Sequence, residues 1–233
     1  ASYHSPGPCT FYGTANSNQM LMEFMGLHLP GSSFVKPGTK LREELTKWGT
    51  ERVLQITALG NKYTPISNIL DERAFVNGIV GLMATGGSTN LVLHLPAMAR
   101  AAGVLLNVED FDEISSVTPL MAKVYPNGLA DVNHFHAAGG LGYIIGQLLD
   151  EGLLHENVKT VMGNGLRFYT NEPKITDIGL KFIAMLDKSQ NEKILRPARN
   201  PFQKSGGLKQ LVGSLGTSMI KVSAVTPERS IIQ

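Results

Sequence analysis

The sequence is poor in cysteine, and Cys9 is the only one among 233 residues. A single cysteine cannot form a disulfide within the chain, which excludes a disulfide framework as the source of stability. Thiols stay reduced in the cytoplasm, so the sequence predicts a cytoplasmic protein. Apolar residues make up 42% of the chain and charged residues 17%, a composition that can bury a sizeable core.

The sequence also lacks an excess of charge of one sign and a long apolar run. Its 21 basic and 19 acidic residues leave a net charge of +2, without a basic cluster that would bind nucleic acid or a membrane surface. His94, Pro96 and Arg100 interrupt the longest apolar stretches, so none of these could span a bilayer. We therefore expect neither nucleic acid nor a membrane as a partner.

Several common catalytic motifs are missing as well. The sequence contains no HEXXH, GXSXG or GXGXXG pattern, which removes the main support for a zinc protease, an α/β-hydrolase and a Rossmann domain. No lysine follows the glycine pair Gly86 and Gly87 at the place that a P-loop requires. Any chemistry must therefore depend on other patterns.

The apolar residues that are present predict an α/β domain. A helix is expected to begin at Asn16 or Ser17 as its N-cap, and to end at Gly26. Its apolar stripe, interpreted as core packing, consists of Met20, Leu21, Phe24, Met25 and Leu27. A second helix, over residues 41–59, carries a run of charges that indicates a solvated face. Short apolar runs alternate with helical patterns as far as residue 161, which is typical of a layered α/β arrangement.

The composition changes twice along the chain. Residues 1–165 are predicted to form part of an N-terminal α/β domain, and the polar residues 166–204 a linker with one short helix. From residue 205 to 233, β-branched residues and spaced glycines predict the first strands of a truncated, β-barrel-like C-terminal domain. Because the chain starts with alanine and its last apolar run stops almost at once, we expect both ends to be cuts through a longer protein.

The first candidate for chemistry is Cys9, which follows the Pro-Gly-Pro turn of residues 6–8 and precedes the first predicted helix. Such a cysteine can be an inert buried residue, an exposed residue without a function, a nucleophile or a metal ligand. The rigid turn and the positive end of the helix dipole favour the thiolate, which suits a nucleophile or a ligand. Since one thiolate cannot hold a metal cluster, further ligands would have to lie elsewhere. The spacing leaves these alternatives open.

The second candidate is the segment ATGGSTN, in which two glycines follow an apolar run and a helix begins. Glycines permit close approach of the backbone, and the first N–H groups of a helix point at a phosphate or carboxylate. An ordinary turn with a Ser or Thr cap is the alternative. The predicted substrate-binding residues are Gly86, Gly87, Ser88, Thr89 and Asn90.

The third candidate is the pair His134 and His136, with Asp131 nearby. These residues could bind a metal or act as acid and base, but two positions apart they share a face only on a strand. Capping of a helix that begins near Ala137 is the favoured interpretation. His94 lies in an apolar helix and is predicted to be a core histidine.

Six blocks of sequence stand in a fixed order from about Ser2 to the end of the chain. They are CTFYGTANSNQM, EFMGLHLPGSSFV, NGIVGLMATGGSTN, HLPAMARAAG, YPNGLADVNHFHAAGG and GGLKQLVGSLG. Together they resemble the dihydroxy-acid and phosphogluconate dehydratase family. The CTFYG and DVNHF segments favour the branch that acts on phosphogluconate, because the dihydroxy-acid branch typically has Cys-Gly-Gly-Met at the first of them.

The resemblance implies an iron–sulfur hydro-lyase in which Cys9 is one ligand of the cluster, with [4Fe-4S] favoured over [2Fe-2S]. It implies that residues 1–165 belong to a cluster-binding domain. Two further cysteines and ligands for Mg²⁺ are expected before Ala1, and the catalytic base after Gln233. The full-length enzyme is expected to be a homodimer, and the isolated chain to be inactive.

The implied reaction is the dehydration of 6-phospho-D-gluconate to 2-dehydro-3-deoxy-6-phosphogluconate in the Entner–Doudoroff pathway. An iron of the cluster would act as Lewis acid on the C3 hydroxyl while a base removes the proton at C2. The segment Gly86–Asn90 is expected to hold an anionic end of the substrate, which is a physical inference and not a family ligand. The alternatives are a dehydratase of the same family acting on a dihydroxy acid or a non-phosphorylated sugar acid, and a non-catalytic binding or scaffold protein.

Overall fold

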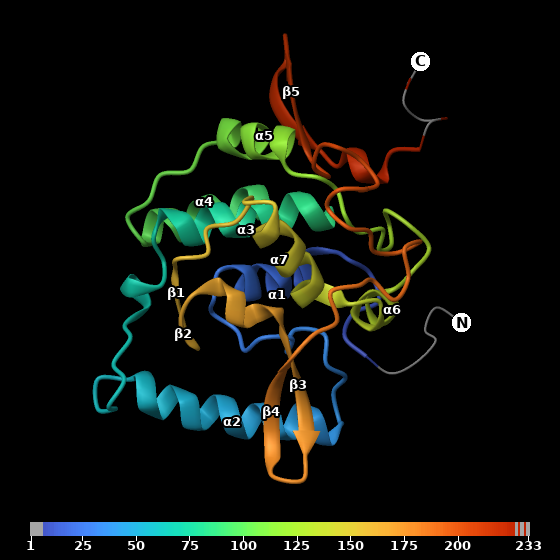
Figure 1. Ribbon diagram of the computed structural model, residues 1–233. Helices are drawn as coiled ribbons and strands as arrows, with labels where there is room; N and C mark the ends of the chain where they lie inside the picture. The colour runs from blue at the N-terminus through green and yellow to red at the C-terminus, as the bar shows by residue number, and fades with distance from the viewer. Residues whose placement is uncertain (1–6, 227, 229–230, 232–233) are drawn as a thin grey trace.

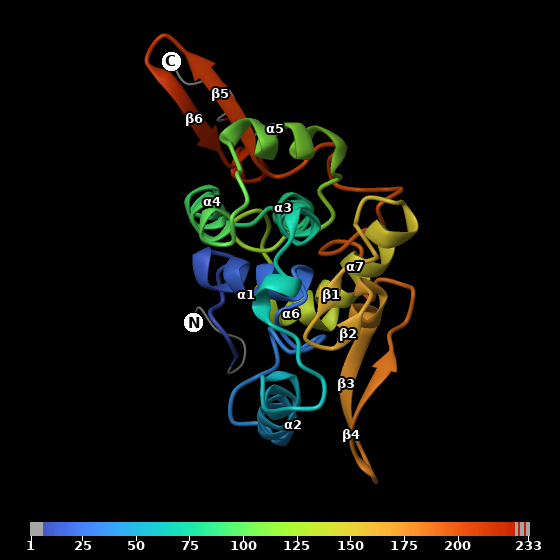
Figure 2. The same cartoon turned by 90° about the vertical axis from the view of Figure 1, so that its left-hand side faces the viewer.

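The computed structural model describes residues 7–226, 228 and 231 of the chain. Its helices lie in tiers, with α5 at one end, then α3 and α4, then α1 and α7, and α2 at the opposite end (Figure 1 and Figure 2). The helices are α1 (Thr14–Phe24), α2 (Lys40–Ile56), α3 (Glu72–Thr85), α4 (Leu91–Ala101), α5 (Val108–Val117), α6 (Val132–Ala137) and α7 (Gly140–Asp150). Three short 3₁₀ helices are η1 (Ile66–Asn68), η2 (Leu166–Thr170) and η3 (Val222–Ala224).

Helix α1 lies at the centre of the molecule and contacts α3, α4 and α7. The predicted stripe is confirmed, since Met20, Leu21, Phe24 and Met25 are all buried in the core. Two glycines of α3 let the helices approach closely: a Cβ at Gly81 would lie 2.6 Å from the Phe24 ring. The close approach therefore depends on the absence of side chains on this face of α3.

The apolar run at residues 75–87, which could be read as a strand or as a buried helix, is the helix α3. Asp71 caps its start, where the carboxylate accepts a hydrogen bond from the Ala74 N–H at 3.1 Å. Gly86 ends it with φ of +61°, a left-handed conformation that favours glycine. Because α3 is buried nearly all round, its sequence shows no polar face, and periodicity could not separate helix from strand.

Within the described residues the strands form three separate antiparallel hairpins, so this part of the chain is a mixture of helices and small sheets. The alternation of strands and helices predicted before residue 161 is wrong, because the described residues there hold helices and one two-residue strand. The pairs are β1 (Lys159–Thr160) with β2 (Gly163–Asn164), β3 (Asn171–Thr176) with β4 (Gly179–Ala184), and β5 (Lys209–Gly213) with β6 (Gly216–Ile220).

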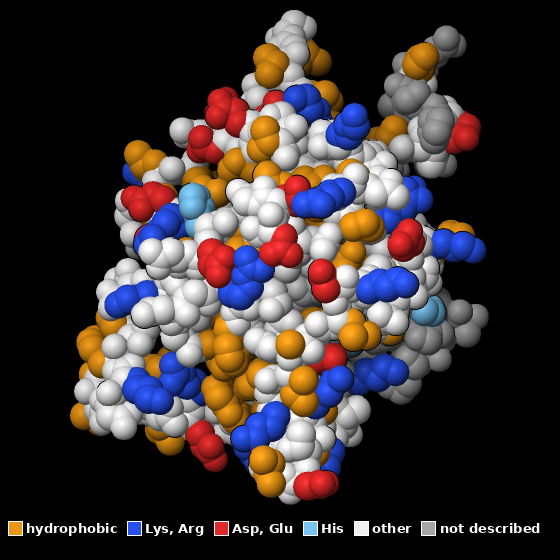
Figure 3. Space-filling view, viewed as in Figure 1, with side chains coloured by type: hydrophobic (Ala, Val, Ile, Leu, Met, Phe, Trp, Pro, Cys, Tyr) orange, Lys and Arg blue, Asp and Glu red, His pale blue; other side chains and the backbone are white. Residues whose placement is uncertain are grey.

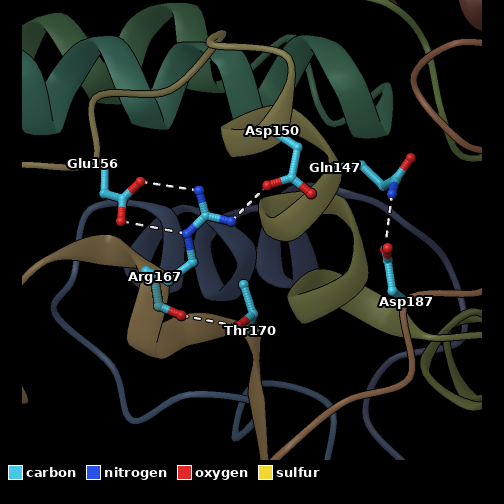
Figure 4. A network of polar contacts seen from close by, with 6 residues as sticks. All are labelled: Gln147, Asp150, Glu156, Arg167, Thr170 and Asp187. Carbon is cyan, nitrogen blue, oxygen red and sulfur yellow. Dashed lines mark hydrogen bonds and ion pairs between the residues drawn. The ribbon is translucent and has the colours of Figure 1, made fainter.

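The segment predicted as a linker with a short helix, residues 166–204, instead contains η2 and the β3–β4 hairpin. This hairpin packs on α2, where the rings of Trp48 and Phe182 meet edge to face at 5.3 Å. Figure 4 shows how Arg167 ties η2 to α7, with ion pairs to Asp150 at 2.6 Å and to Glu156 at 3.0 Å. These contacts order residues whose polar composition resembles a linker.

The β5–β6 hairpin projects beyond α5 at the end of the molecule (Figure 1). Its pairing runs from Lys209 opposite Ile220 to Gly213 opposite Gly216. Two strands are thus present in the segment 205–233, and no closed barrel is seen among the described residues. Of the last apolar run, Ile231 is described, and residues 232 and 233 lie outside the described residues.

The surface carries charges of both signs. Figure 3 shows basic and acidic side chains interspersed over the face seen in Figure 1. The charged helix predicted at residues 41–59 is α2, in which Leu45 is the only buried residue. Of the helices in the described part of the chain, none is both long enough and apolar enough to cross a membrane.

Candidate functional site

Cys9 lies in the irregular segment before α1, and its side chain is exposed. Helix α1 begins at Thr14 after Gly13 as the N-cap, earlier than the predicted caps Asn16 and Ser17. Of the Pro-Gly-Pro turn, Pro6 lies outside the described residues. An exposed thiol is not the inert buried alternative for Cys9, and an exposed residue without a function, a nucleophile and a metal ligand stay open.

Asn16 fixes the backbone that carries Cys9. Its side chain is almost fully buried, and Nδ2 donates hydrogen bonds to the carbonyls of Cys9 at 2.5 Å and Phe11 at 2.7 Å. The same segment is tied to the rest of the molecule by the Tyr12 N–H, which donates to the Tyr125 carbonyl at 2.8 Å. Cys9 therefore projects from a loop whose main chain is held from two sides.

The predicted segment 86–90 touches the same first turn of α1. The Ser17 hydroxyl accepts a hydrogen bond from the Ser88 N–H at 2.9 Å, and the Thr14 and Ser88 hydroxyls lie 3.1 Å apart. Asn90 Nδ2 donates to Thr14 Oγ1 at 2.7 Å. One helical turn thus contacts both candidate segments, which are separated by more than 70 residues in the sequence.

The backbone of this segment has few N–H groups left for an anion. The N–H groups of Gly86 and Gly87 donate to carbonyls of α3, at 3.4 and 3.1 Å. That of Ser88 is used by Ser17, and that of Asn90 donates to Ser88 Oγ at 3.2 Å. Only the Thr89 N–H and hydroxyl make no hydrogen bond with other described residues. The two glycines are thus explained by an ordinary turn after α3. An anion at this segment would have to be bound mainly by Thr89 and by side-chain groups.

A second polar cluster lies behind the turn at Gly86. Asn127 Nδ2 donates to the Gly86 carbonyl at 2.8 Å, and a Cβ at Gly86 would lie 2.3 Å from that nitrogen and 2.9 Å from Ser223 Oγ. Asn127 Oδ1 and Ser223 Oγ are buried without a hydrogen-bond partner among the described residues. Burial lowers the pKa of Lys221, two residues before Ser223, to about 8.

The histidines are placed differently from the sequence prediction. Helix α6 begins at Val132, not near Ala137, and Asp131 caps it by accepting a hydrogen bond from the His134 N–H at 3.0 Å. His134 Nδ1 also lies 3.0 Å from Asp131 Oδ1, so the pair belongs to the helix start. His94 is exposed on α4 and is not a core residue, because the apolar run around it buries only one face.

The donor atoms fit one position of an iron–sulfur cluster. Thiolate is the usual ligand of such clusters, and the exposed Cys9 side chain on a fixed backbone can supply one. Within residues 7–226, 228 and 231, no three His, Cys, Asp or Glu side chains gather closely enough to hold a metal ion. The remaining ligands would have to come from outside these residues.

Sequence reasoning missed the roles of Asn16, Ser17, Asn127 and Ser223. For Asn16 and Ser17 the only signal was the polar run TANSN at the start of an otherwise apolar helix, which we interpreted as capping, and no pattern marked Asn127 or Ser223. Capping residues and residues that bond distant segments belong to the same types, so local sequence could not separate the two.

Comparison with known proteins gives consistent matches. Residues 1–169 match the profile of the family described as "Dihydroxy-acid/6-phosphogluconate dehydratase N-terminal". The chain is 58% identical over its whole length to a phosphogluconate dehydratase of Rhizobium meliloti (strain 1021), and 52% identical to that of Escherichia coli (strain K12). A dihydroxy-acid dehydratase of Metallosphaera sedula is 38% identical over 94% of the chain. The chain spans 38% of the length of the first of these relatives, 39% of the second and 37% of the third.

Proposed function

The chain belongs to the dihydroxy-acid/6-phosphogluconate dehydratase family, and from this premise we propose that it is the central part of a 6-phosphogluconate dehydratase. The full-length enzyme would convert 6-phospho-D-gluconate to 2-dehydro-3-deoxy-6-phosphogluconate. The single observation that carries the proposal is the 58% identity over all 233 residues to a phosphogluconate dehydratase. The lower identity of 38% to a dihydroxy-acid dehydratase supports the choice of branch.

In this proposal Cys9 is one thiolate ligand of an iron–sulfur cluster, with [4Fe-4S] favoured. When bound, the cluster supplies a Lewis acid that makes the C3 hydroxyl of the substrate a better leaving group. The residues of this chain hold the ligand: Asn16 fixes the Cys9 carbonyl, and the exposed thiol is accessible to a cluster. The other ligands, the catalytic base and the ligands for Mg²⁺ would be supplied by other parts of the full-length enzyme.

The substrate would be held near the segment Gly86–Asn90, with Thr89 as its main contact for an anionic end. This assignment is supported by the unused N–H and hydroxyl groups of Thr89 and by the contacts of Ser88 and Asn90 with the α1 turn that follows Cys9. Replacing Ser88 and Thr89 together by alanine in the full-length enzyme should raise KM for 6-phosphogluconate. An unchanged KM would exclude the segment from substrate binding.

The proposal extends to the organisation of the enzyme. Residues 1–165 would belong to the cluster-binding domain, and the β5–β6 hairpin would be the first part of a β-barrel-like C-terminal domain over residues 205–233 and beyond. The enzyme would be a cytoplasmic homodimer. Light scattering of the purified full-length protein tests the dimer, and a monomer mass would contradict it.

The decisive experiment compares two substrates and one ligand variant of the full-length enzyme under anaerobic conditions. Turnover of 6-phosphogluconate should far exceed turnover of 2,3-dihydroxyisovalerate, and the reverse order would favour the dihydroxy-acid alternative. Iron and sulfide should be bound by the wild type and lost, in part or in full, by Cys9→Ser. Full cluster content in that variant would overturn the ligand assignment.

A further inference from the structure

The first turn of α1 makes contacts that helix capping does not require. Its three polar side chains, Thr14, Asn16 and Ser17, point their hydrogen-bonding groups at two segments of the chain outside α1. Thr, Asn and Ser are poor helix formers, so this turn contains them at a cost in local stability. Such a conflict between local propensity and observed structure is expected where a functional constraint acts.

Asn16 fixes the backbone at Cys9. It is 1% exposed, and a single amide nitrogen holds the carbonyls of both Cys9 and Phe11. Its Oδ1 is buried and finds no donor among the described residues. This unsatisfied atom is unfavourable, but Nδ2 supplies both loop carbonyls with a donor that an apolar side chain lacks. The amide is therefore best explained by the position that it gives to the Cys9 backbone.

Ser17 and Thr14 act toward the other segment. Ser17 is fully buried and accepts a hydrogen bond from the Ser88 N–H, while Thr14 contacts the side chains of Ser88 and Asn90. The fit is close, because a Cβ at Gly87 would lie 2.9 Å from Ser17 Oγ. The segment thus has a fixed position relative to the same helical turn.

We propose that the first turn of α1 sets the position of the Cys9 thiolate relative to the segment Ser88–Asn90, with Asn16 and Ser17 as the two positioning residues. This inference rests on the proposed function, in which Cys9 holds the cluster and the segment contacts the substrate. Neither residue touches substrate or iron. Asn16 acts through the Cys9 backbone and Ser17 through the Ser88 backbone, from neighbouring positions on one helix.

The test uses Asn16→Leu in the full-length enzyme, since leucine has a similar size and removes both the donor and the unsatisfied oxygen. Asn18→Ala is the matched control, because Asn18 Nδ2 donates only to the Thr14 carbonyl within the same helix, at 2.9 Å. We expect Asn16→Leu to lose its cluster about 10-fold or more faster in air than the wild type, as is common when a residue supporting a metal ligand is removed. In the cluster-free protein, alkylation of Cys9, followed by mass spectrometry of its peptide, should also change in rate. The control should match the wild type in both measurements.

Ser17→Ala provides the second arm of the test. It should keep the full iron and sulfide content and raise KM for 6-phosphogluconate several-fold, while kcat changes less. The inference is overturned if Asn16→Leu and Asn18→Ala behave alike, or if Ser17→Ala alters neither KM nor kcat, in an enzyme whose wild type binds iron and turns over. A wild type that lacks iron or turnover would instead overturn the proposed function. If Asn16→Leu does not fold by circular dichroism, Ser17→Ala decides the outcome.

Discussion

Helices α1 and α2 are neighbours in the sequence, and different interactions stabilise them. Six residues of α1 are buried, three of them polar, whereas α2 buries Leu45 alone. Helix α2 has local support from Thr39 as its N-cap and from an ion pair between Lys47 and Glu44 at 2.8 Å, besides its packing against the β3–β4 hairpin. Helix α1 has no side-chain cap and depends on tertiary contacts. The polar residues to consider for function are therefore those that contact distant segments, not those that stabilise their own helix.

At the other end of α1, Glu23 is fully buried. Its two carboxylate oxygens accept hydrogen bonds from the Gly31 N–H at 2.9 Å and the Ser33 N–H at 2.8 Å. Arg42 of α2 reaches the same loop and donates to the carbonyls of Ser32 and Val35, both at 2.7 Å. The buried Glu23 carboxylate therefore fixes the backbone of the loop between α1 and α2.

The largest effect is expected from Glu23→Ala. Two buried N–H groups would lose their acceptor, which should lower the free energy of unfolding by about 3 kcal/mol. Glu23→Gln keeps one acceptor oxygen and should lower the free energy of unfolding by less. Urea unfolding of the chain measures both. Glu44→Ala on α2 is the control, and if it destabilises as much as Glu23→Ala, the contrast between the helices is wrong.

The buried Glu23 carboxyl group should also make the stability of the fold depend on pH. Burial raises the pKa of its carboxyl group, an effect that the two N–H donors and Arg42 oppose. Since the folded state then binds the proton more tightly than the unfolded state, stability should fall as pH rises from the ordinary carboxyl range to the raised pKa. This slope should disappear in Glu23→Gln, and an unchanged slope would assign it to another group.

A moderate effect is expected from Gly81→Ala in α3. The added Cβ would lie 2.6 Å from Phe24 Cγ and 2.9 Å from Met20 Sδ, in the contact between α1 and α3. Overpacking of this kind should destabilise by about 1 to 3 kcal/mol, measured by urea unfolding. An alanine that is tolerated without loss would mean that α1 can shift within the core.

The central elements could be predicted because their sequences carry a strong apolar pattern. The stripe of Met20, Leu21 and Phe24 predicted both the helix and its burial, and the charges of α2 predicted its solvated face. The hairpin β3–β4 was not predicted, since its apolar residues stand in a segment rich in polar residues and its position depends on the contact between Phe182 and Trp48. Polar composition indicated a linker where tertiary contacts produce strands.

The candidate site could be predicted only in part. The resemblance predicts Cys9 as a cluster ligand, and the glycine pair predicts the segment 86–90 as a substrate contact. Asn16 was assigned as a cap, because its partners, the carbonyls of Cys9 and Phe11, are identified only by the folded structure. The hydrogen-bond partners of the backbone in segment 86–90 also could not be predicted. The Ser88 N–H donates to the hydroxyl of Ser17, which lies 71 positions away in the sequence.

A small gain in stability is expected from Gly49→Ala in α2. Gly49, like Gly81 in α3, lies within a helix. A Cβ at Gly49 would meet only Leu29 Cδ1 at 3.6 Å, an ordinary contact distance. Alanine lowers the entropy of the unfolded chain and should stabilise by about 0.4 to 1 kcal/mol, visible as a higher Tm. Destabilisation would show that α2 packs more tightly against the body than the structure indicates.

The smallest effect is expected from Glu44→Gln, which removes the exposed ion pair with Lys47. The hydrogen bond and charge of Lys47 lower the pKa of Glu44, so the pair contributes stability that is present above the ordinary carboxyl pKa and is lost as pH falls through the lowered one. This slope has the opposite sign to that of Glu23. Because both groups are in contact with water, salt should screen the difference between Glu44→Gln and the wild type. Thermal unfolding at pH 3 to 7, with and without added salt, tests this. A difference that persists at high salt would mean that α2, like α1, depends on a buried charge.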